Sequence, residues 1–190
     1  MTSAGSRSGS AFECYRGYLG LLAGLQVDSR LKGKVDLSGI VQQTLLEAHL
    51  AKEKVKDEPS EKQLAWLRRV LAHNLADEIR KVRSDKRDAR RERSLHAAIE
   101  DSSVRLETCI PADQSSAGAR LERQERAVQI AEALGRLPEA QREALVMQHW
   151  HGRSLAEIAS QMNRTPVAVA GLIKRALSQL RVEMRHLNGA

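Results

Sequence analysis

Residues 154–180 read SLAEIASQMNRTPVAVAGLIKRALSQL, and this stretch indicates two helices joined by a tight turn. Asn163 stands where the chain must turn, because asparagine tolerates the left-handed backbone conformation better than most residues. Thr165 is a suitable N-cap for the second helix, and Pro166 suits its first turn. Apolar residues recur at helical spacing on both sides of the turn: Leu155, Ile158, Ala159, Met162, Val169, Ile173, Leu177 and Leu180. The stretch therefore predicts a helix-turn-helix.

Two interpretations of this motif are open on its residues alone. The second helix enters the major groove of DNA, or the pair is a helical hairpin without a nucleic-acid partner. The composition favours a polyanionic partner, because the 190 residues carry a formal net charge of +7. Aromatic residues are only 3% of the chain, and glycine and proline are sparse within its periodic segments. The sequence therefore predicts an all-α protein.

The sequence disfavours membrane, secreted and metal-binding proteins. No segment approaches the roughly 18 apolar residues of a spanning helix, and the first ten residues lack the apolar core of a signal peptide. We therefore expect a cytoplasmic protein without membrane insertion, in which Cys14 and Cys109 are free thiols. His149 and His151 would point to different sides of a helix, so they do not predict a shared metal ion. No metal is expected.

Composition divides the chain into four segments. Residues 1–10 are small and polar, and we expect a disordered tail. Residues 11–98 are periodic and predict a first helical domain, whereas residues 99–118 lose the periodicity and have the composition of a flexible linker. Helical periodicity returns over residues 119–190, which predict a second domain. The linker length suits either a hinge between docked domains or two domains that grip separate sites.

Three helices are expected in the first domain. The first presents an apolar face that consists of Phe12, Tyr15, Leu19 and Leu22. The second begins at an N-cap supplied by Asp36 or Ser38. The third is one long helix over residues 63–95, and it is strongly cationic from Arg80 onward. Trp66 precedes these cations, and it suits either a core anchor or a stacking surface for unstacked bases.

Three segments, in this order, resemble a known family. Residues 66–80, WLRRVLAHNLADEIR, are similar to the family pattern W-L-x-x-I-A-x-N-x-x-x-D-x-x-R. Residues 36–49, DLSGIVQQTLLEAH, are similar to the family's polymerase-binding segment. Residues 133–162, ALGRLPEAQREALVMQHWHGRSLAEIASQM, are similar to its C-terminal domain. Over roughly residues 11–185 the chain resembles a bacterial RNA polymerase sigma factor of the extracytoplasmic-function group (group 4).

The resemblance implies a transcription initiation factor and not an enzyme. The first domain would be a sigma region 2 bundle, and the second a sigma region 4 domain that contains the helix-turn-helix. Such a protein binds the β and β′ subunits of core RNA polymerase, directs the polymerase to promoter DNA and assists promoter opening. An anti-sigma factor is a further candidate partner. The resemblance implies no cofactor.

The resemblance also assigns residues to three surfaces. For core polymerase binding it implies Asp36, Gln42, Gln43 and Leu46. For the −10 promoter element it implies Trp66, Arg69, His73, Asn74, Asp77, Arg80, Lys81 and Arg83. For the −35 element it implies Arg153, Ser154, Arg164, Thr165, Pro166, Val167, Ala168, Ala170, Gly171, Lys174 and Arg175.

This chain departs from the family pattern at positions that bear on recognition. His73 stands where asparagine is usual, and Gly39 replaces an acidic residue. In the second helix of the motif, Ala170, Gly171 and Leu172 occupy places where lysine, serine and arginine are frequent. Because few long polar side chains are left there, we expect −35 recognition to depend on phosphate contacts and DNA shape.

Three other functions compete with this interpretation. A conventional helix-turn-helix regulator would bind an operator as a dimer, and the linker and second basic helix disfavour it. An enzyme acting on nucleic acid would need a nucleophile–base pair, a metal-binding carboxylate cluster or a glycine-rich phosphate loop, and the sequence offers none. An anti-sigma or adaptor protein would lack the two basic surfaces.

Overall fold

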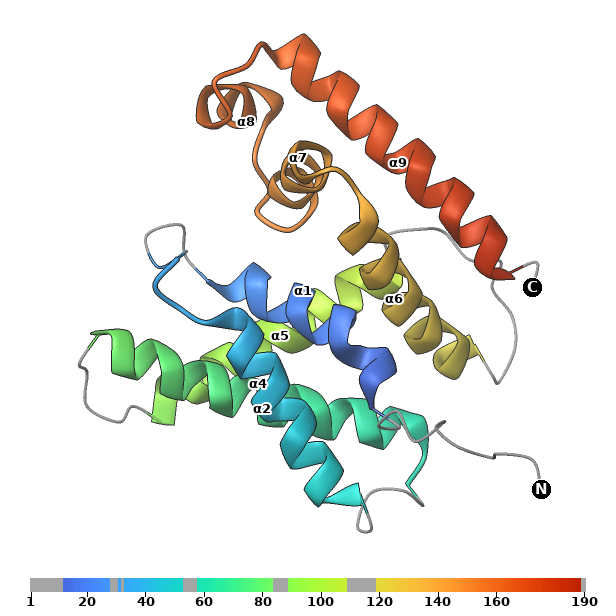
Figure 1. Cartoon of the computed structure of the whole chain (residues 1–190). Helices are drawn as coiled ribbons and strands as arrows, with labels where there is room; N and C mark the ends of the chain where they lie inside the picture. The colour runs from blue at the N-terminus through green and yellow to red at the C-terminus, as the bar shows by residue number, and fades with distance from the viewer. Residues whose placement is uncertain are drawn as a thin grey trace, which may run out of the picture. The chain divides into compact units, whose positions relative to one another are not determined.

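The computed structural model describes residues 12–27, 31, 33–52, 58–83, 89–108 and 119–188 (Figure 1). These residues form helices and connecting turns, with no strand among them, which confirms the predicted all-α fold. The chain divides into two compact units, Met1–Asp101 and Ser102–Ala190, and the division falls within a helix. The predicted tail, residues 1–10, lies outside the described residues.

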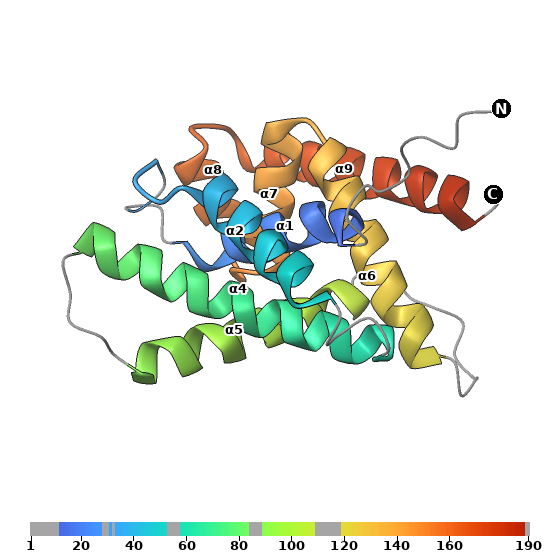
Figure 2. The same ribbon diagram turned by 60° about the horizontal axis from the view of Figure 1, so that its bottom comes forward.

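The first unit is a helical bundle. It consists of the 3-10 helix η1 (Glu13–Tyr15) and helices α1 (Arg16–Gln26), α2 (Leu37–Leu50), α4 (Ser60–Arg83) and the first part of α5 (Ala89–Thr108). Helices α1, α2 and α4 pack against one another, and α5 lies alongside α4 in both ribbon views (Figures 1 and 2). The fully buried side chains of its core are Tyr18, Leu19, Leu22, Leu67, Leu71, Leu75 and Ile99. Burial of each leucine stabilises the unit by about 2 kcal/mol.

The predicted apolar face of the first helix is confirmed except at one aromatic residue. Phe12 at the start of η1, and Leu19 and Leu22 on α1, are buried, whereas Tyr15 is only half-buried. The aromatic side chain of the core is Tyr18, and this residue was not part of the predicted face. Helical spacing alone did not distinguish the two tyrosines, which lie three residues apart on one side of the helix.

A buried arginine connects three helices of this unit. Arg68 on α4 is only 6% exposed. Its Nε donates a hydrogen bond to Glu100 Oε1 on α5 at 2.7 Å, and its Nη1 donates to the Tyr18 hydroxyl on α1 at 3.1 Å. Loss of solvent works against the charged guanidinium, but these two partners outweigh it and raise the pKa of Arg68. Arg68 therefore remains charged inside the bundle, where its hydrogen bonds connect α4 to α1 and α5.

The prediction of one long helix over residues 63–95 is wrong. Helix α4 ends at Arg83, and α5 begins at Ala89 and returns antiparallel to α4. The Arg68–Glu100 contact and a 3.3 Å contact from His73 Nδ1 to Glu92 Oε1 record this reversal, because partners later in α5 pair with residues earlier in α4. The reversal buries Ile99, which a continuous helix would leave far from the core. Residues 84–88, which include part of the predicted cationic run, lie outside the described residues.

The predicted linker begins too early in the chain. Residues 99–108, counted as linker, form the C-terminal half of α5. The serines that suggested linker composition, Ser102 and Ser103, are buried, as are Ile99 and Leu106. A helix with two buried serines has a weak apolar period, and for this reason the composition was misleading. The remainder of the predicted linker, residues 109–118, lies outside the described residues.

The second unit is built around its last helix. It contains α6 (Ala119–Arg136), α7 (Glu139–His149), α8 (Leu155–Gln161) and α9 (Pro166–Asn188). Helix α9 contacts α6, α7 and α8, and it extends well beyond α8 in the ribbon view (Figure 1). The buried core side chains include Ile130, Leu134, Leu145, Ile158, Val169, Ala176 and Leu180. The last turns of α5 belong to this unit, and Arg105 Nη1 donates to the Trp150 carbonyl, just after α7, at 2.9 Å.

Candidate nucleic-acid interface

The turn between α8 and α9 has the geometry that the sequence predicts. Asn163 adopts a left-handed conformation with φ of 52°, the one positive φ of a non-glycine residue in the described part of the chain. The turn is closed by backbone hydrogen bonds from Met162 N to Ile158 O at 2.9 Å and from Arg164 N to Ala159 O at 2.9 Å. These bonds satisfy carbonyls at the end of α8, so the chain leaves this helix in a fixed direction.

The start of α9 is equally well defined. The Thr165 hydroxyl accepts a hydrogen bond from Ala168 N at 3.2 Å, which confirms Thr165 as the N-cap. Pro166 is the first helical residue, where its missing N–H leaves no unpaired donor. The first turn of α9 is therefore ordered by its own residues.

Helix α8 begins with a reciprocal capping box. Ser154 Oγ accepts from Glu157 N at 3.3 Å, while Glu157 Oε2 accepts from Ser154 N at 2.8 Å and from the Ser154 hydroxyl at 2.8 Å. These bonds, led by the Ser154 backbone N–H, lower the pKa of Glu157, and an ion pair with Arg153 Nη1 at 3.3 Å adds to the effect. The resemblance assigns Ser154 to the −35 element, where its backbone and side-chain donors could bind a DNA phosphate, but both donors already bond to Glu157 in this structure. A phosphate would have to compete with that carboxylate.

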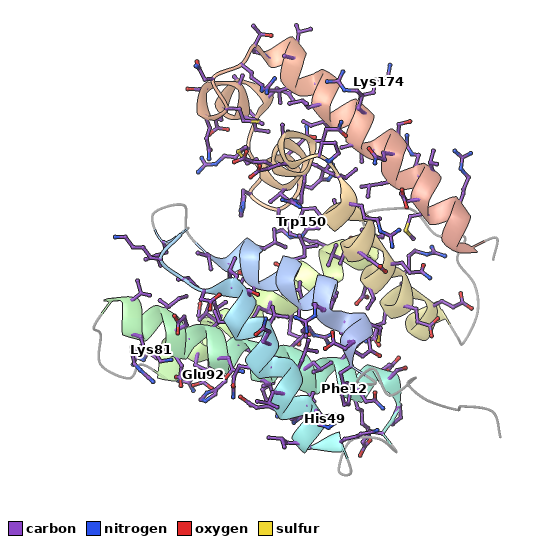
Figure 3. All side chains as sticks on the ribbon, viewed as in Figure 1. Phe12, His49, Lys81, Glu92, Trp150 and Lys174 are labelled. Carbon is purple, nitrogen blue, oxygen red and sulfur yellow. The ribbon has the colours of Figure 1, made fainter. Side chains whose placement is uncertain are left out.

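One face of α9 is buried and the other is open. Val169, Leu172, Ile173, Ala176 and Leu180 are buried against the rest of the unit. Leu172, one of the departures from the family pattern, is therefore a core residue and not a surface contact. The exposed residues at the start of α9 are Pro166, Val167, Ala170, Lys174 and Arg175, with Ala168 and Gly171 half-buried. Figure 3 shows Lys174 on the outer side of this helix.

Cations surround this open face. Arg164, Lys174 and Arg175 are exposed, and none of them pairs with a carboxylate of the described residues. The guanidinium of Arg175 extends over Gly171, where a Cβ atom would lie 3.5 Å from Arg175 Nη1. Unpaired cations beside a smooth helix face suit the phosphates that flank a DNA groove.

The residues predicted to bind core polymerase lie on the outer face of α2. Gln42, Gln43 and Leu46 are exposed. Leu46 is 51% exposed, and Leu50, one turn further along, is 76% exposed, so the two form an apolar pair that the prediction had included only in part. Gln43 Nε2 donates to Glu47 Oε1 at 2.9 Å, which leaves Gln42 and the two leucines as the open part of this face.

Asp36 has a structural role at the start of α2. Its carboxylate accepts a hydrogen bond from Gly39 N at 2.9 Å, which identifies Asp36 rather than Ser38 as the N-cap. A Cβ atom at Gly39 would collide with this carboxylate. An acidic residue at that position would add charge repulsion to the collision, so glycine there fits the cap. Glycine at this position therefore leaves room for the Asp36 carboxylate in its capping position.

Most of the predicted −10 residues follow one stripe along α4. Trp66, Arg69, His73, Asp77 and Arg80 succeed one another at intervals of three or four residues, and all are at least partly exposed. From Trp66 to Arg80 the helix rises about 21 Å. The aromatic ring and the last cation therefore lie at opposite ends of a stripe and do not converge on one pocket.

Carboxylates offset much of the positive charge of α4. Asp77 pairs with Arg80 Nη1 at 3.0 Å and lies 3.8 Å from His73 Nε2. Glu78 pairs with Lys81 Nζ at 3.3 Å. Arg69 is exposed and forms no ion pair with the described residues. The side chain of Arg83 is outside the described part of the structure.

Asn74 is held by α2. Its Nδ2 donates to Thr44 Oγ1 at 3.2 Å and to Glu47 Oε1 at 3.2 Å. The Thr44 hydroxyl in turn donates to the Ile40 carbonyl at 2.8 Å. Asn74 therefore joins α4 to the polymerase-contact candidate α2, and a role in base recognition would require it to leave these partners.

A polar segment, residues 57–63, precedes Trp66, and under the resemblance it could form a pocket for an unpaired base together with Trp66; the structure describes this segment only in part. Asp57 lies outside the described residues. Gln63 Nε2 donates to the Glu58 carbonyl at 2.8 Å, and Lys62 Nζ pairs with the Glu58 carboxylate at 2.8 Å. Trp66 is half-buried, between the two roles that the sequence left open for it.

No group of three or more histidine, cysteine, aspartate or glutamate side chains in the described residues is arranged to hold a metal ion. None of the described helices is both long and apolar enough to cross a membrane.

Comparison with known families gives a match that includes the helix-turn-helix. Residues 127–180 match the family model described as Sigma-70, region 4. The match covers all of α7 and α8, the second half of α6 and the first two thirds of α9, which is less than half of the chain. No curated protein matches the chain significantly. The second unit is therefore similar to Sigma-70 region 4, a helix-turn-helix DNA-binding region that acts in promoter recognition during transcription.

Proposed function

We propose that this chain is a sigma factor of the extracytoplasmic-function group, a cytoplasmic transcription initiation factor that takes core RNA polymerase to specific promoters. The observation that carries the proposal is the match of residues 127–180 to Sigma-70 region 4, on a helix-turn-helix with an open, cation-flanked second helix. In this proposal α9 reads the −35 element, and the stripe on α4 contacts the −10 element. Opening of the promoter needs contacts that favour unpaired bases, and no covalent step at a protein residue.

The proposed polymerase contact is the outer face of α2. Gln42, Leu46 and Leu50 lie on that face, and exposed leucines one turn apart are suited to an apolar groove on a partner. The cores of stable protein interfaces rely on such buried apolar contacts. An anti-sigma factor that covered the same face would keep the chain from its polymerase.

Binding to purified core RNA polymerase tests this proposal. The full chain should form a complex that elutes together in gel filtration, and Gln42→Ala combined with Leu46→Ala should weaken it at least tenfold, because two interface side chains are lost. Alanine suits a helix, so α2 should stay folded. Val104→Ala, which removes an equally exposed apolar side chain outside α2, serves as the control.

Two results would contradict the proposal. One is a folded wild-type chain that shows no association with core polymerase at low salt. The other is a stable dimer of the chain that binds duplex DNA tightly without polymerase, since that behaviour belongs to a conventional helix-turn-helix regulator.

A further inference from the structure

Val167 is the most exposed large apolar side chain in the described part of the molecule, at 82%. Scattered exposed valines are common on protein surfaces, so exposure alone has no functional meaning. The position of this residue is what distinguishes it. Val167 is the second residue of α9, at the end of the helix where recognition helices contact base edges.

The orientation of Val167 is fixed by its surroundings. The Thr165 cap and the buried Val169 and Ile173 set the rotation of α9 against the unit. Ala170 and Lys174 follow Val167 at intervals of three and four residues and are likewise exposed. The side chains on the open face of the first two turns are therefore small and apolar, and the guanidinium of Arg175, from the third turn, extends back over Gly171.

Val167, Ala170 and Gly171 cannot read bases through side-chain hydrogen bonds. Valine, alanine and glycine side chains have no donor or acceptor, whereas most base-pair identities in the major groove are presented as donors and acceptors. The thymine C5-methyl group is the apolar feature of that groove, and small apolar side chains contact it. Small residues also let the helix backbone approach the base edges. Arg164 precedes these residues in the chain and Lys174 follows them, and such exposed cations are suited to phosphate contacts.

We propose that Val167 is a specificity-determining residue that reads the C5-methyl group of a thymine in the upstream promoter element. The inference rests on the proposed function of α9 as the reader of that element. The sequence predicts that recognition of this element depends on phosphate contacts and DNA shape. The present inference adds direct recognition of one base by a side chain. Burial of one methyl group corresponds to about fourfold in affinity.

The experiment uses the full chain bound to core polymerase and duplexes selected from a randomised library. In a selected duplex, each thymine of the upstream element is replaced in turn by deoxyuridine, which removes only the methyl group. At one thymine the replacement should weaken binding about fourfold. With Val167→Ala, which removes both γ-methyl groups, the ratio of binding between the thymine and deoxyuridine duplexes should fall from fourfold toward one at that position. Val182→Ala changes another exposed valine of α9 and should keep the fourfold ratio.

The possible failures are distinguishable. If no duplex is selected, the proposed function itself is wrong, and this inference is wrong with it. If duplexes are selected but no deoxyuridine replacement weakens binding, promoter recognition stands and methyl readout is refuted. If the fourfold ratio persists in Val167→Ala, another residue reads the methyl group and the assignment to Val167 is overturned.

Discussion

At the scale of single residues, polar side chains that the family resemblance assigns to DNA binding already form hydrogen bonds within the chain. Asn74 donates to Thr44 and Glu47, and Ser154 donates to Glu157. Each bond lowers the free energy of the folded chain, so a nucleic-acid contact at these positions must replace it. Arg69 and Lys174 form no ion pair with the described residues, and they are therefore the stronger candidates for phosphate contacts.

The buried Arg68 yields a prediction about stability. Arg68→Ala should destabilise the first unit by about 2 kcal/mol, because it removes the two hydrogen bonds that the buried guanidinium donates to Glu100 and to the Tyr18 hydroxyl. Amide hydrogen exchange should show faster exchange along α1, α4 and α5. Arg69→Ala, at the neighbouring exposed arginine, should leave exchange unchanged. Equal exchange rates in the two variants would mean that the Arg68 contacts contribute little to the stability of the first unit.

At the scale of elements, the sequence was most informative where structure is decided locally. Asn163 and Thr165 determine the turn and the start of α9 through bonds to residues within a few positions. The sequence could not show the reversal between α4 and α5, because it depends on contacts between residues such as Arg68 and Glu100 that lie far apart in the chain. The sequence could not show that Ser102 and Ser103 of α5 are buried either, because their burial depends on residues that lie far from them in the chain.

The capping box of α8 predicts a pH dependence. Bonds to Ser154 lower the pKa of Glu157 below its ordinary 4.5. A carboxylate with a lowered pKa in the folded state stabilises the fold above its unfolded pKa, and this stability is lost as the pH falls through the folded pKa. The protection of the α8 amides against hydrogen exchange should therefore decrease as the pH is lowered below about 4.5.

The cause can be tested at Ser154. In Ser154→Ala the titration midpoint of Glu157, followed by NMR, should rise toward 4.5, because the hydroxyl bond is lost and the cap is weakened. Ser160→Ala, at an exposed serine of the same helix, should leave the midpoint in place. Alanine keeps the backbone N–H that bonds to Glu157, so a midpoint that is the same in all three proteins would show that the Ser154 hydroxyl does not contribute to this pKa.

At the scale of the whole molecule, the family match and the proposed function differ in extent. The match covers the unit that contains the helix-turn-helix, and the resemblance of residues 36–49 and 66–80 to polymerase-binding and −10 segments extends the proposal to the first unit. The two units offer surfaces suited to different partners. The first has a face of leucine and glutamine side chains on α2, and the second has an apolar face flanked by cations on α9. A protein that reads DNA with one and holds the polymerase with the other requires both in a single chain.

The most direct test of this account is transcription by core RNA polymerase from a library of randomised duplex templates, with and without the full chain, followed by mapping of transcript 5′ ends. The account predicts that the chain concentrates initiation at templates that share an upstream and a downstream sequence element. Initiation that is the same in amount and position with and without the chain would contradict it.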